Sequence, residues 1–377
     1  MRVLHLIETT GPGGAETVFV QLAAGLRRRG HTSVAVVHGS GWVANALESE
    51  GIAPVMMPLG RTPDLAFVAR AGTLLRRERI DLIQTHLLTS AMYGAMLGRM
   101  FGVPVVSTFH GTNDFGQPGW RRSFKLGAMR LGGARAVFVS ESLQRACAEI
   151  PGMPLQRTAV VHNGIDCEKF APGGDRSFRR DLRLADDTIL VGALGNIRPA
   201  KDYATFLRAA HELSRQSDRW HFVIVGDPTH HEGLYSDLVA LRKQLDIEKR
   251  VTFAGFRNDT ARVISGMDVL VCSSSSEGFS LSVCQAMASG VPVVSTRCGG
   301  PEEILRDDVT GLLVPVAAAR EIAVAIQRVA DASRSALRDR LVCAARADVV
   351  ARFSLPAMLD GYERVYASAL GGATRSA

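Results

Sequence analysis

The feature that most constrains the fold is a repeated alternation of short, β-branched apolar runs with stretches of helical spacing. The apolar runs of the first series occupy residues 3–7, 33–39, 81–86, 103–111 and 135–140. Those of the second series occupy residues 188–195, 220–227, 250–255, 268–275, 290–297 and 311–316. Continuous apolar strands separated by helices are typical of a parallel sheet that helices cover on both faces. The chain is therefore predicted to be an α/β protein.

The pattern is interrupted between its two series, and the interruption predicts a domain boundary. The segment NGID at 163–166 ends the first series, and a stretch containing Pro and Gly follows at 171–174. A single core rarely grows beyond about 250–300 residues, and this chain has 377. We predict two doubly wound, Rossmann-like domains facing a cleft, at residues 1–165 and 170–350.

A last segment, residues 354–370, also has helical spacing. Its apolar positions are Met358, Leu359, Tyr362, Val365 and Tyr366. A helix with one apolar face must bury that face against a larger body. We predict that this helix crosses back to the N-terminal domain.

The composition is that of a folded protein outside the secretory route. Hydrophobic residues make up 46% of the chain and charged residues 21%, which excludes intrinsic disorder. The first residues lack the length and cleavage site of a signal peptide, and the apolar stretch 91–106 is broken by Arg99 and Pro104. The six cysteines form no CxxC pair and are expected to be reduced thiols. A cytoplasmic location is predicted, with or without peripheral contact to the inner face of the membrane.

The net charge of +7 is unevenly distributed, because the whole excess lies in residues 1–165. That half is expected to meet an anion, either a membrane surface or a phosphate-bearing acceptor, unless the charge serves solubility alone. The segment 119–131 places Trp120, Phe124 and Leu131 beside four cations. It is either a contact with an anionic membrane surface or a solvated helix. No nucleic-acid recognition motif accompanies the charge, so no nucleic-acid partner is expected.

A glycine-rich loop, GPGGAE at residues 11–16, joins the first predicted strand to the first predicted helix. Glycine lets the backbone approach a phosphate, and N–H groups at a helix N-terminus face it. We expect Gly13 and Gly14 to contact the phosphate of a bound ligand, although a tight structural turn would also explain these two residues. The dinucleotide fingerprint is absent, since Glu16 stands at its third glycine and the next strand ends in His38 rather than an acid. Hydride transfer is disfavoured.

The stretch 273–304 carries the most specific pattern, in which a loop opens a helix directly after an apolar strand. The N–H groups expected to face a diphosphate there belong to Gly278, Phe279, Ser280 and Leu281. Glu277 precedes them in the loop, and Gln285, eight residues later, is expected to face inward from the helix. No DxD-like acidic pair ends a strand in this half of the chain, so no metal site is expected.

Other segments fall in a fixed order along the chain, namely GGAE at 13–16, STFHG at 107–111, HNGID at 162–166, GNIRPAKD at 195–202, VIVGD at 223–227, GG at 299–300 and TGLLVP at 310–315. Together with the stretch 273–304, this series resembles family 4 of the retaining glycosyltransferases, over nearly the whole chain. The resemblance implies the GT-B fold and transfer of a hexose-type sugar from a nucleotide diphosphate, UDP or GDP, to a glycan or lipid-linked acceptor. It implies retention at the anomeric carbon and no cofactor or metal.

The resemblance also implies roles for individual residues. His110 and Glu277 correspond to the residues that approach the transferred sugar, and Lys201 to a cation for the diphosphate. Two positions depart from the family. Asn196 stands where the family has Arg, so Arg198 is the expected substitute, and Gln285 replaces the second Glu of the E-x7-E motif, where the ribose is held. His86 and Asn113 are the candidates for acceptor contact, with a structural role as the alternative for His86.

Two other classes of protein remain open at this stage. A nucleotide-sugar epimerase uses a similar two-domain fold. The departures at Gln285 and Asn196 also leave a non-catalytic protein that binds sugar nucleotides.

Overall fold

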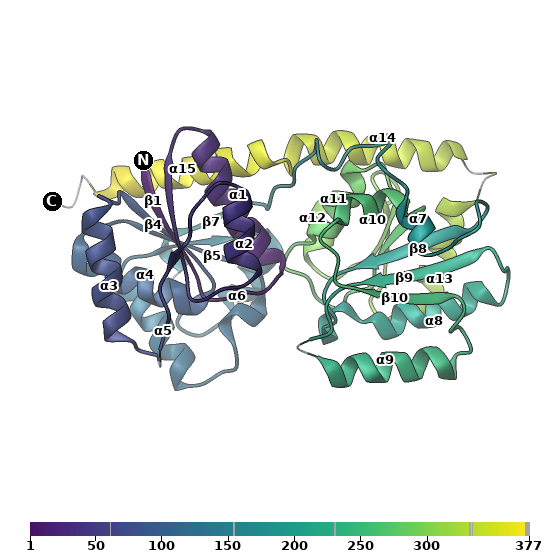
Figure 1. The fold of residues 1–377 in the computed structure, drawn as a ribbon, viewed down its shortest axis with the longest axis horizontal. Coiled ribbons are helices and arrows are strands. Elements are labelled where there is room, and N and C mark those ends of the chain that lie inside the picture. The colour runs from purple at the N-terminus through teal and green to yellow at the C-terminus, as the bar shows by residue number, and fades with distance from the viewer. Residues whose placement is uncertain (61, 154, 230, 332, 334, 374–377) are drawn as a thin grey trace. The chain divides into compact units, whose positions relative to one another are not determined.

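The computed structural model describes residues 1–60, 62–153, 155–229, 231–331, 333 and 335–373. The chain forms two compact units (Figure 1). Unit 1 comprises Met1–Gly164 with Leu355–Ala377, and unit 2 comprises Ile165–Ser354. Each unit is built on one parallel β-sheet whose strands alternate with helices. The predicted α/β fold with two Rossmann-like sheets is confirmed.

The sheet of unit 1 has the order β3-β2-β1-β4-β5-β6-β7 within the described residues. Its strands are β1 (Arg2–Ile7), β2 (Thr32–Val37), β3 (Val55–Met56), β4 (Leu82–His86), β5 (Val105–Phe109), β6 (Arg135–Phe138) and β7 (Thr158–Val160). The helices around it are α1 (Gly14–Arg28), α2 (Trp42–Ser49), α3 (Leu65–Arg77), α4 (Leu88–Phe101), α5 (Trp120–Leu131), α6 (Glu141–Ala148), α15 (Leu355–Ala373) and the 3₁₀ turns η1 (Thr112–Phe115) and η2 (Leu155–Arg157). Chain order reverses beside β1, which pairs with both β2 and β4.

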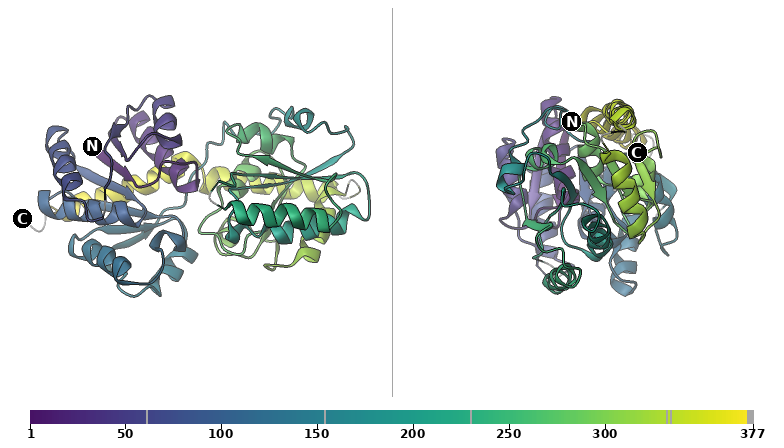
Figure 2. Two further views of the ribbon diagram at one scale, coloured as in Figure 1. Left: turned by 60° about the horizontal axis from the view of Figure 1, so that its bottom comes forward. Right: turned by 90° about the vertical axis from the view of Figure 1, so that its right-hand side faces the viewer.

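The C-terminal helix α15 packs within unit 1 against α1 and β5, and Figure 2 shows it in yellow among the elements of that unit. Tyr366 is fully buried, and its hydroxyl donates to Gln84 Oε1 at 3.0 Å. At the surface, Arg29 Nη1 lies 2.6 Å from Glu363 Oε2. The helix therefore supplies apolar and polar contacts to strands β5 and β4, with hydrogen bonds between residues 254 and 282 positions apart in sequence.

The sheet of unit 2 has the order β10-β9-β8-β11-β12-β13 in the part of the chain that is described. Its strands are β8 (Ile189–Leu194), β9 (Trp220–Val225), β10 (Val251–Gly255), β11 (Val269–Cys272), β12 (Val293–Thr296) and β13 (Leu312–Val314). The helices around it are α7 (Phe178–Asp181), α8 (Tyr203–Ser214), α9 (Glu232–Gln244), α10 (Thr260–Gly266), α11 (Leu281–Ala288), α12 (Gly300–Ile304), α13 (Ala319–Ala330), α14 (Ser335–Arg352) and the 3₁₀ turn η3 (Pro199–Lys201). The core lies between this sheet, α8 and α13.

Local capping explains where several of these helices begin. The Asp64 carboxylate accepts a hydrogen bond from the Phe67 N–H at 2.9 Å and so starts α3. Asp202 does the same for the Thr205 N–H at the start of α8. Such caps satisfy N–H groups that have no partner inside the helix.

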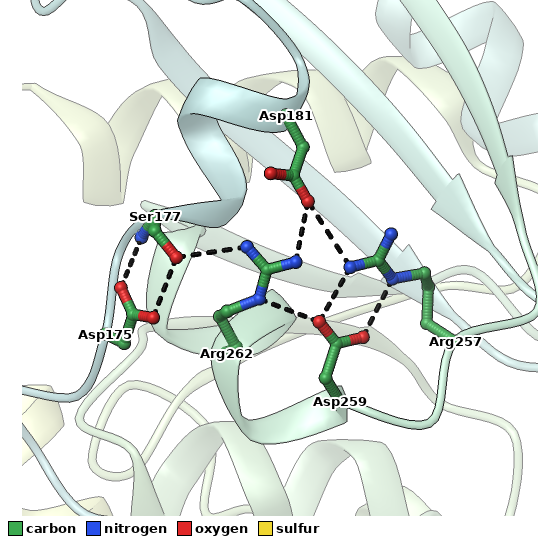
Figure 3. Close-up of polar contacts among 6 residues, drawn as sticks. All are labelled: Asp175, Ser177, Asp181, Arg257, Asp259 and Arg262. Carbon is green, nitrogen blue, oxygen red and sulfur yellow. Dashed lines mark hydrogen bonds and ion pairs between the residues drawn. The ribbon is translucent and has the colours of Figure 1, made fainter.

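A cluster of ion pairs ties α7 to α10 in unit 2 (Figure 3). We call Asp181, Arg257, Asp259 and Arg262 the arginine–aspartate cluster. Arg262 lies 2.6 Å from Asp181 and 2.7 Å from Asp259, and Arg257 lies 3.3 Å and 2.6 Å from the same two carboxylates. Hydrogen bonds from Arg257 hold the pKa of Asp259 well below its usual range. Two cations and two anions are matched, as expected of a structural clamp between distant segments.

Candidate functional site

A buried ion pair lies at the carboxyl ends of two neighbouring central strands of unit 2. Lys201 belongs to η3, after β8, and Glu277 to the loop after β11. Lys201 Nζ lies 2.6 Å from Glu277 Oε1, and the Ser274 hydroxyl donates to the same oxygen at 2.7 Å. Strand order reverses between β8 and β11, and ligands of doubly wound sheets bind at that point. We call Lys201 and Glu277 the lysine–glutamate pair.

The surrounding backbone holds this pair in place. The Ser273 hydroxyl and the Ser275 N–H donate to the carbonyls of Lys201 and Ala200, at 2.9 and 2.8 Å. On the other side, the Gly300 backbone lies so close that a Cβ would stand 2.6 Å from the Gly278 carbonyl oxygen. A larger residue there would push the loop out of position, so the glycine is required by close approach.

Charge compensation explains how the pair tolerates burial. The side chains of Lys201 and Glu277 are only 21% and 13% exposed. Burial by itself lowers the pKa of a lysine, but the adjacent Glu277 carboxylate more than reverses this, and the pKa of Lys201 is raised. The lysine is therefore held in its charged form, ready to interact with an anion.

The start of α11 lies in the same loop. The Phe279 ring is buried and packs edge-on against Phe353, with ring centroids 5.5 Å apart, so its contribution to a ligand would come from the backbone. Ser280 is the N-cap; its side chain makes no capping hydrogen bond to the α11 backbone, and its hydroxyl lies 3.2 Å from the Ser282 hydroxyl. Gln285 is half-buried on α11 and makes no side-chain hydrogen bond to the described residues. Its amide thus has no structural partner that fixes it elsewhere.

A second group of polar residues lies in unit 1, at the ends of β4 and β5. His86 Nδ1 lies 2.9 Å from His110 Nε2, and the two rings stack with centroids 5.1 Å apart. Phe19 packs edge-on against His86 and also against His5, on β1. Burial lowers the pKa of His5 and of His110 to about 3, and that of His86 well below its usual value. All three rings are neutral at physiological pH.

These imidazoles retain unused hydrogen-bonding capacity. His86 Nε2, His110 Nδ1 and both ring nitrogens of His5 are buried without a hydrogen-bond partner among the described residues. Buried polar atoms are usually paired with protein or water. The exceptions gathered here are suited to meet water or a ligand hydroxyl.

A cavity of about 530 Å³ adjoins this group in unit 1. Its lining includes Glu8, Asn113, Asp114, Arg121 and Lys125. Asp114 accepts hydrogen bonds from the His110 and Gly111 N–H groups at 2.6 and 3.2 Å, and burial raises the pKa of its carboxyl to about 7. Burial also raises the pKa of Glu8. The cavity thus combines half-buried carboxyls with cations of α5.

Both units match models of known protein families. Residues 12–169 match the model described as Glycosyltransferase Family 4, and residues 188–332 match the one described as Glycosyl transferases group 1. A D-inositol 3-phosphate glycosyltransferase of Mycobacterium marinum is 28% identical over 341 residues, covering 86% of this chain and 71% of that protein. The chain belongs to family 4 of the glycosyltransferases.

Two solved structures have the same fold as this glycosyltransferase. A glycosyltransferase of Rickettsia africae superposes with a TM-score of 0.85 at 19% identity, covering 98% of each chain. HepE of Anabaena, solved with UDP-glucose, superposes with a TM-score of 0.85 at 23% identity, covering 98% of this chain and 100% of its own. The GT-B fold expected from the sequence is thereby confirmed.

Some residues singled out in the sequence of this glycosyltransferase are brought together and others are not. Lys201 and Glu277 are in contact, as are His86 and His110, and Asn113 lines the cavity beside the imidazoles. Arg198 is exposed, and its guanidinium forms no ion pair with the described residues. Together these positions define one candidate group of residues in each unit.

The glycine-rich loop and Asn196 have partners inside the protein. The Thr9 hydroxyl donates to Glu16 Oε1 at 2.5 Å, and a Cβ on Gly13 would lie 2.2 Å from Glu16 Oε2. The glutamate carboxylate therefore covers Gly13, and an anion at Gly13 and Gly14 would have to displace it. Asn196 Oδ1 accepts from the Asp227 N–H at 3.2 Å, which links the loops after β8 and β9.

Sequence reasoning missed the carboxyls of the unit 1 cavity in this glycosyltransferase. Glu8 follows β1 directly and accepts a hydrogen bond from the Ser90 N–H at 2.7 Å. Asp114 stands four residues after His110, where it caps the chain reversal. The signal for Glu8 was its place directly after a buried strand, since strand ends in such sheets line ligand sites. Asp114 lies in the η1 turn beyond the end of β5 and had no such signal.

Proposed function

We propose that this glycosyltransferase moves a hexose from a nucleotide diphosphate sugar to a glycan or lipid-linked acceptor, with retention of the anomeric configuration. The observation that carries the proposal is the lysine–glutamate pair at the carboxyl ends of β8 and β11, beside the start of α11. UDP and GDP are the candidate leaving groups. UDP is favoured because HepE, of the same fold, was solved with UDP-glucose.

In this proposal the diphosphate lies between Lys201 and the start of α11. The lysine ammonium has three N–H donors, and Glu277 engages it through a single contact. The other donors and the N–H groups of residues 278–281 stabilise the charge that grows on the leaving diphosphate. Arg198, exposed on the same loop as Lys201, adds a second cation. Gln285 accepts from a ribose hydroxyl.

Glu277 is the group of unit 2 that acts on the transferred sugar. Lys201 and Ser274 fix the Glu277 carboxylate, which accepts hydrogen bonds from sugar hydroxyls. His110 is neutral and uses Nε2 toward His86, so Nδ1 is the ring atom available for a hydroxyl. The acceptor oxygen bonds to the anomeric carbon on the face from which the diphosphate departs, and a leaving phosphate oxygen takes the acceptor proton. Configuration is retained without a covalent intermediate.

The unit 1 cavity is proposed to bind the acceptor, with His86 and Asn113 at its margin. Arg121, Arg122 and Lys125 line it, so a phosphate-bearing acceptor would be complemented by charge. The relative from Mycobacterium marinum is named for D-inositol 3-phosphate, an anionic acceptor. A polyprenyl-linked diphosphate sugar offers the same chemistry.

A membrane surface is proposed as a further partner of unit 1, on the strength of α5. Trp120, Phe124 and Leu131 on this helix are 74%, 47% and 78% exposed, beside the cations that line the cavity. Exposed aromatics with adjacent cations favour an anionic bilayer surface. Among the described residues no helix has the length and apolar content to cross a membrane.

The reaction is proposed to need no divalent metal, since Lys201 and the α11 N-terminus supply the charge that a metal would supply. The described residues contain no group of three or more His, Cys, Asp or Glu side chains placed to hold an ion. Full activity after treatment with EDTA is expected. An EDTA-sensitive reaction that manganese restores would contradict this part of the proposal.

One experiment separates the proposal from its two alternatives. The protein is screened by thermal shift against UDP, GDP, ADP and their sugars, because a ligand that binds the folded state raises its stability. The stabilising sugar nucleotide is then incubated with and without membrane lipid extract as acceptor. Release of nucleoside diphosphate only with acceptor supports a transferase. Epimerised sugar without acceptor would identify an epimerase, and binding without any turnover a non-catalytic protein.

A further inference from the structure

A buried hydrogen-bond network joins the C-terminal helix α15 to strands β4 and β5 of unit 1. The Tyr366 hydroxyl donates to Gln84 Oε1 at 3.0 Å, and Gln84 Nε2 donates to Thr108 Oγ1 at 2.9 Å. The Thr108 hydroxyl lies 3.0 Å from the Tyr362 hydroxyl. All four residues are fully buried. We call Gln84, Thr108, Tyr362 and Tyr366 the tyrosine network.

Packing alone does not account for the polar groups of the tyrosine network. Buried polar side chains lose their hydration, and the hydrogen bonds that replace it return little net free energy. Phenylalanine in place of either tyrosine would keep the ring contact, in which the Tyr362 and Tyr366 centroids lie 5.9 Å apart, with no hydroxyl to desolvate. A fully satisfied polar network instead specifies one arrangement of the elements that carry it. Here those elements are α15, β4 and β5.

The tyrosine network lies on the same face of the sheet as His86. Thr108 stands opposite His86 in the register of β4 and β5, and Gln84 precedes His86 by two residues. Partners in register, and residues two apart on one strand, point to the same face of a sheet. His110 follows Thr108 by two residues, directly after β5. We call His86 and His110 the histidine pair, and each member stands beside a residue of the network.

The backbone that follows His86 is anchored to the same threonine. Leu87 is buried and has a φ of 70° and a ψ of 165°. A residue with a side chain remains in this region only where its surroundings over-determine it. The Leu87 N–H donates to the Thr108 carbonyl at 3.1 Å, while the Thr108 hydroxyl is engaged by Gln84 and Tyr362. Thr108 thus links the strained turn after His86 to the tyrosine network.

We propose that Tyr362 and Tyr366 of α15 are positioning residues for the histidine pair. They hold Gln84 and Thr108, and through them the strand ends that set the 2.9 Å contact between the two rings. In that contact His110 Nε2 is engaged, and Nδ1 is presented to a ligand hydroxyl. The C-terminal helix thereby contributes to sugar transfer from a buried position, a consequence that rests on the proposed function.

Two variants of the full-length protein, Tyr362→Phe and Tyr366→Phe, each remove one hydroxyl and keep the ring. We expect kcat to fall about 2–10-fold, as for loss of one buried hydrogen bond, with an unchanged donor KM because the proposed donor residues lie in unit 2. Tyr93→Phe is the matched control. Tyr93 is equally buried in unit 1, and its hydroxyl accepts the Asp64 N–H at 2.8 Å, outside the network. This variant should lose thermal stability and keep its kcat.

The imidazole nitrogen NMR signals of the histidine pair report positioning in the absence of any substrate. We expect them to shift or broaden in both network variants and to stay unchanged in Tyr93→Phe. His221 of β9, in unit 2, is the internal reference.

A double variant separates positioning from a general loss of structure. If Tyr362 acts through the histidine pair, Tyr362→Phe should lower kcat in the wild-type background but not in the His110→Ala background, because coupled residues are not additive. An equal further loss in both backgrounds would show that the hydroxyl is merely structural. Should Tyr362→Phe fail to fold, the same comparison with Tyr366→Phe decides the matter.

The outcomes also separate this inference from the proposed function. Unchanged imidazole signals in both network variants would overturn the inference, as would a kcat loss in Tyr93→Phe equal to theirs. Shifted signals with an unchanged kcat would support the positioning and overturn its consequence for transfer. If the wild-type protein transfers no sugar, the proposed function fails, while the imidazole signals still decide whether α15 positions the histidine pair.

Discussion

The two units of this glycosyltransferase bury polar groups in opposite ways. In unit 2 the lysine–glutamate pair is compensated, since each charge has a partner and Ser274 adds a hydrogen bond. In unit 1 the His86 and His110 rings are neutral and keep ring nitrogens without a partner among the described residues. A compensated pair can hold charge for a phosphate, whereas neutral rings offer hydrogen bonds to hydroxyls. The difference is consistent with the proposal of a donor group in unit 2 and an acceptor group in unit 1.

The arginine–aspartate cluster is a second group of paired charges in unit 2, with which the lysine–glutamate pair can be compared. Its charges are also matched, but its side chains are 25–40% exposed and it lies on α7 and α10 rather than at the strand ends that carry the lysine–glutamate pair. Charge pairing is therefore common to structural and functional groups. Burial at the carboxyl ends of the central strands distinguishes the second kind.

The largest expected effect is that of Glu277→Gln, which keeps the shape of the side chain and removes its charge. We expect turnover to fall about 10²–10³-fold, the range seen when one preorganised polar group is removed from an active site. Initial rates with saturating donor measure it. Glu321→Gln, at an exposed position of α13, is the matched control.

The reciprocal variant is Arg262→Ala in the arginine–aspartate cluster. It should lower the free energy of unfolding measurably but modestly, because ion pairs near the surface contribute little, and leave turnover unchanged. Denaturant unfolding and rates are measured on both variants. If Arg262→Ala lost activity without losing stability, the distinction between the two charge groups would be wrong.

Lys201→Ala should weaken binding of the diphosphate. Charge-assisted hydrogen bonds contribute about 1.5–3 kcal/mol, so nucleoside diphosphate affinity is expected to fall about 10–100-fold. Nucleoside affinity should change little. Calorimetric titration with both ligands measures the difference, with Lys243→Ala on the exposed face of α9 as control. Equal losses for the two ligands would remove Lys201 from the diphosphate.

Asp114→Asn tests the effect of burial on the Asp114 carboxyl, through the pH dependence of protein stability. The folded pKa of Asp114 is raised to about 7, while an unfolded aspartate titrates near 4. Because the unfolded state ionises first, the wild-type loses stability relative to the variant as pH rises from about 4 to 7. We expect the stability difference to grow by about 1–4 kcal/mol over that window. A difference independent of pH would show that Asp114 titrates normally.

The smallest effect is expected for Gln285→Ala. Loss of one hydrogen bond to the ribose costs about 1 kcal/mol, so the donor KM should rise several-fold with little change in kcat, because the contact is the same in the ground and transition states. Gln285→Glu should preserve or tighten donor binding. An unchanged donor KM in Gln285→Ala would withdraw this residue from the ribose.

The sequence predicted most strands of both sheets but not the two edge strands of the unit 1 sheet. Every predicted apolar run contains a strand, because buried parallel strands are continuously apolar. The edge strands β3 and β7 were missed, since two and three residues carry too little periodicity to be recognised. The sequence singled out the individual residues of the two candidate groups but did not show which of them are in contact. Lys201 and Glu277 are 76 positions apart, and only the strand order brings them into contact.

Details that depend on side-chain packing also escaped prediction. The position of the Glu16 carboxylate over Gly13 had no signal in the loop sequence 11–16, and contact of Gly13 and Gly14 with the donor stays a prediction. Such interactions are set by tertiary structure and have no local signature.

The return of α15 to unit 1 has a consequence for synthesis of the chain. Residues 1–164 leave the ribosome long before Leu355, so the nascent unit 1 waits without its last helix. Meanwhile Thr108 and Gln84 lack their hydrogen bonds to Tyr362 and Tyr366, and the apolar surface that α15 will cover is exposed. Transiently exposed apolar surface of this kind is what chaperones bind. Maturation of the first half of the protein is therefore completed only after the second half has been translated.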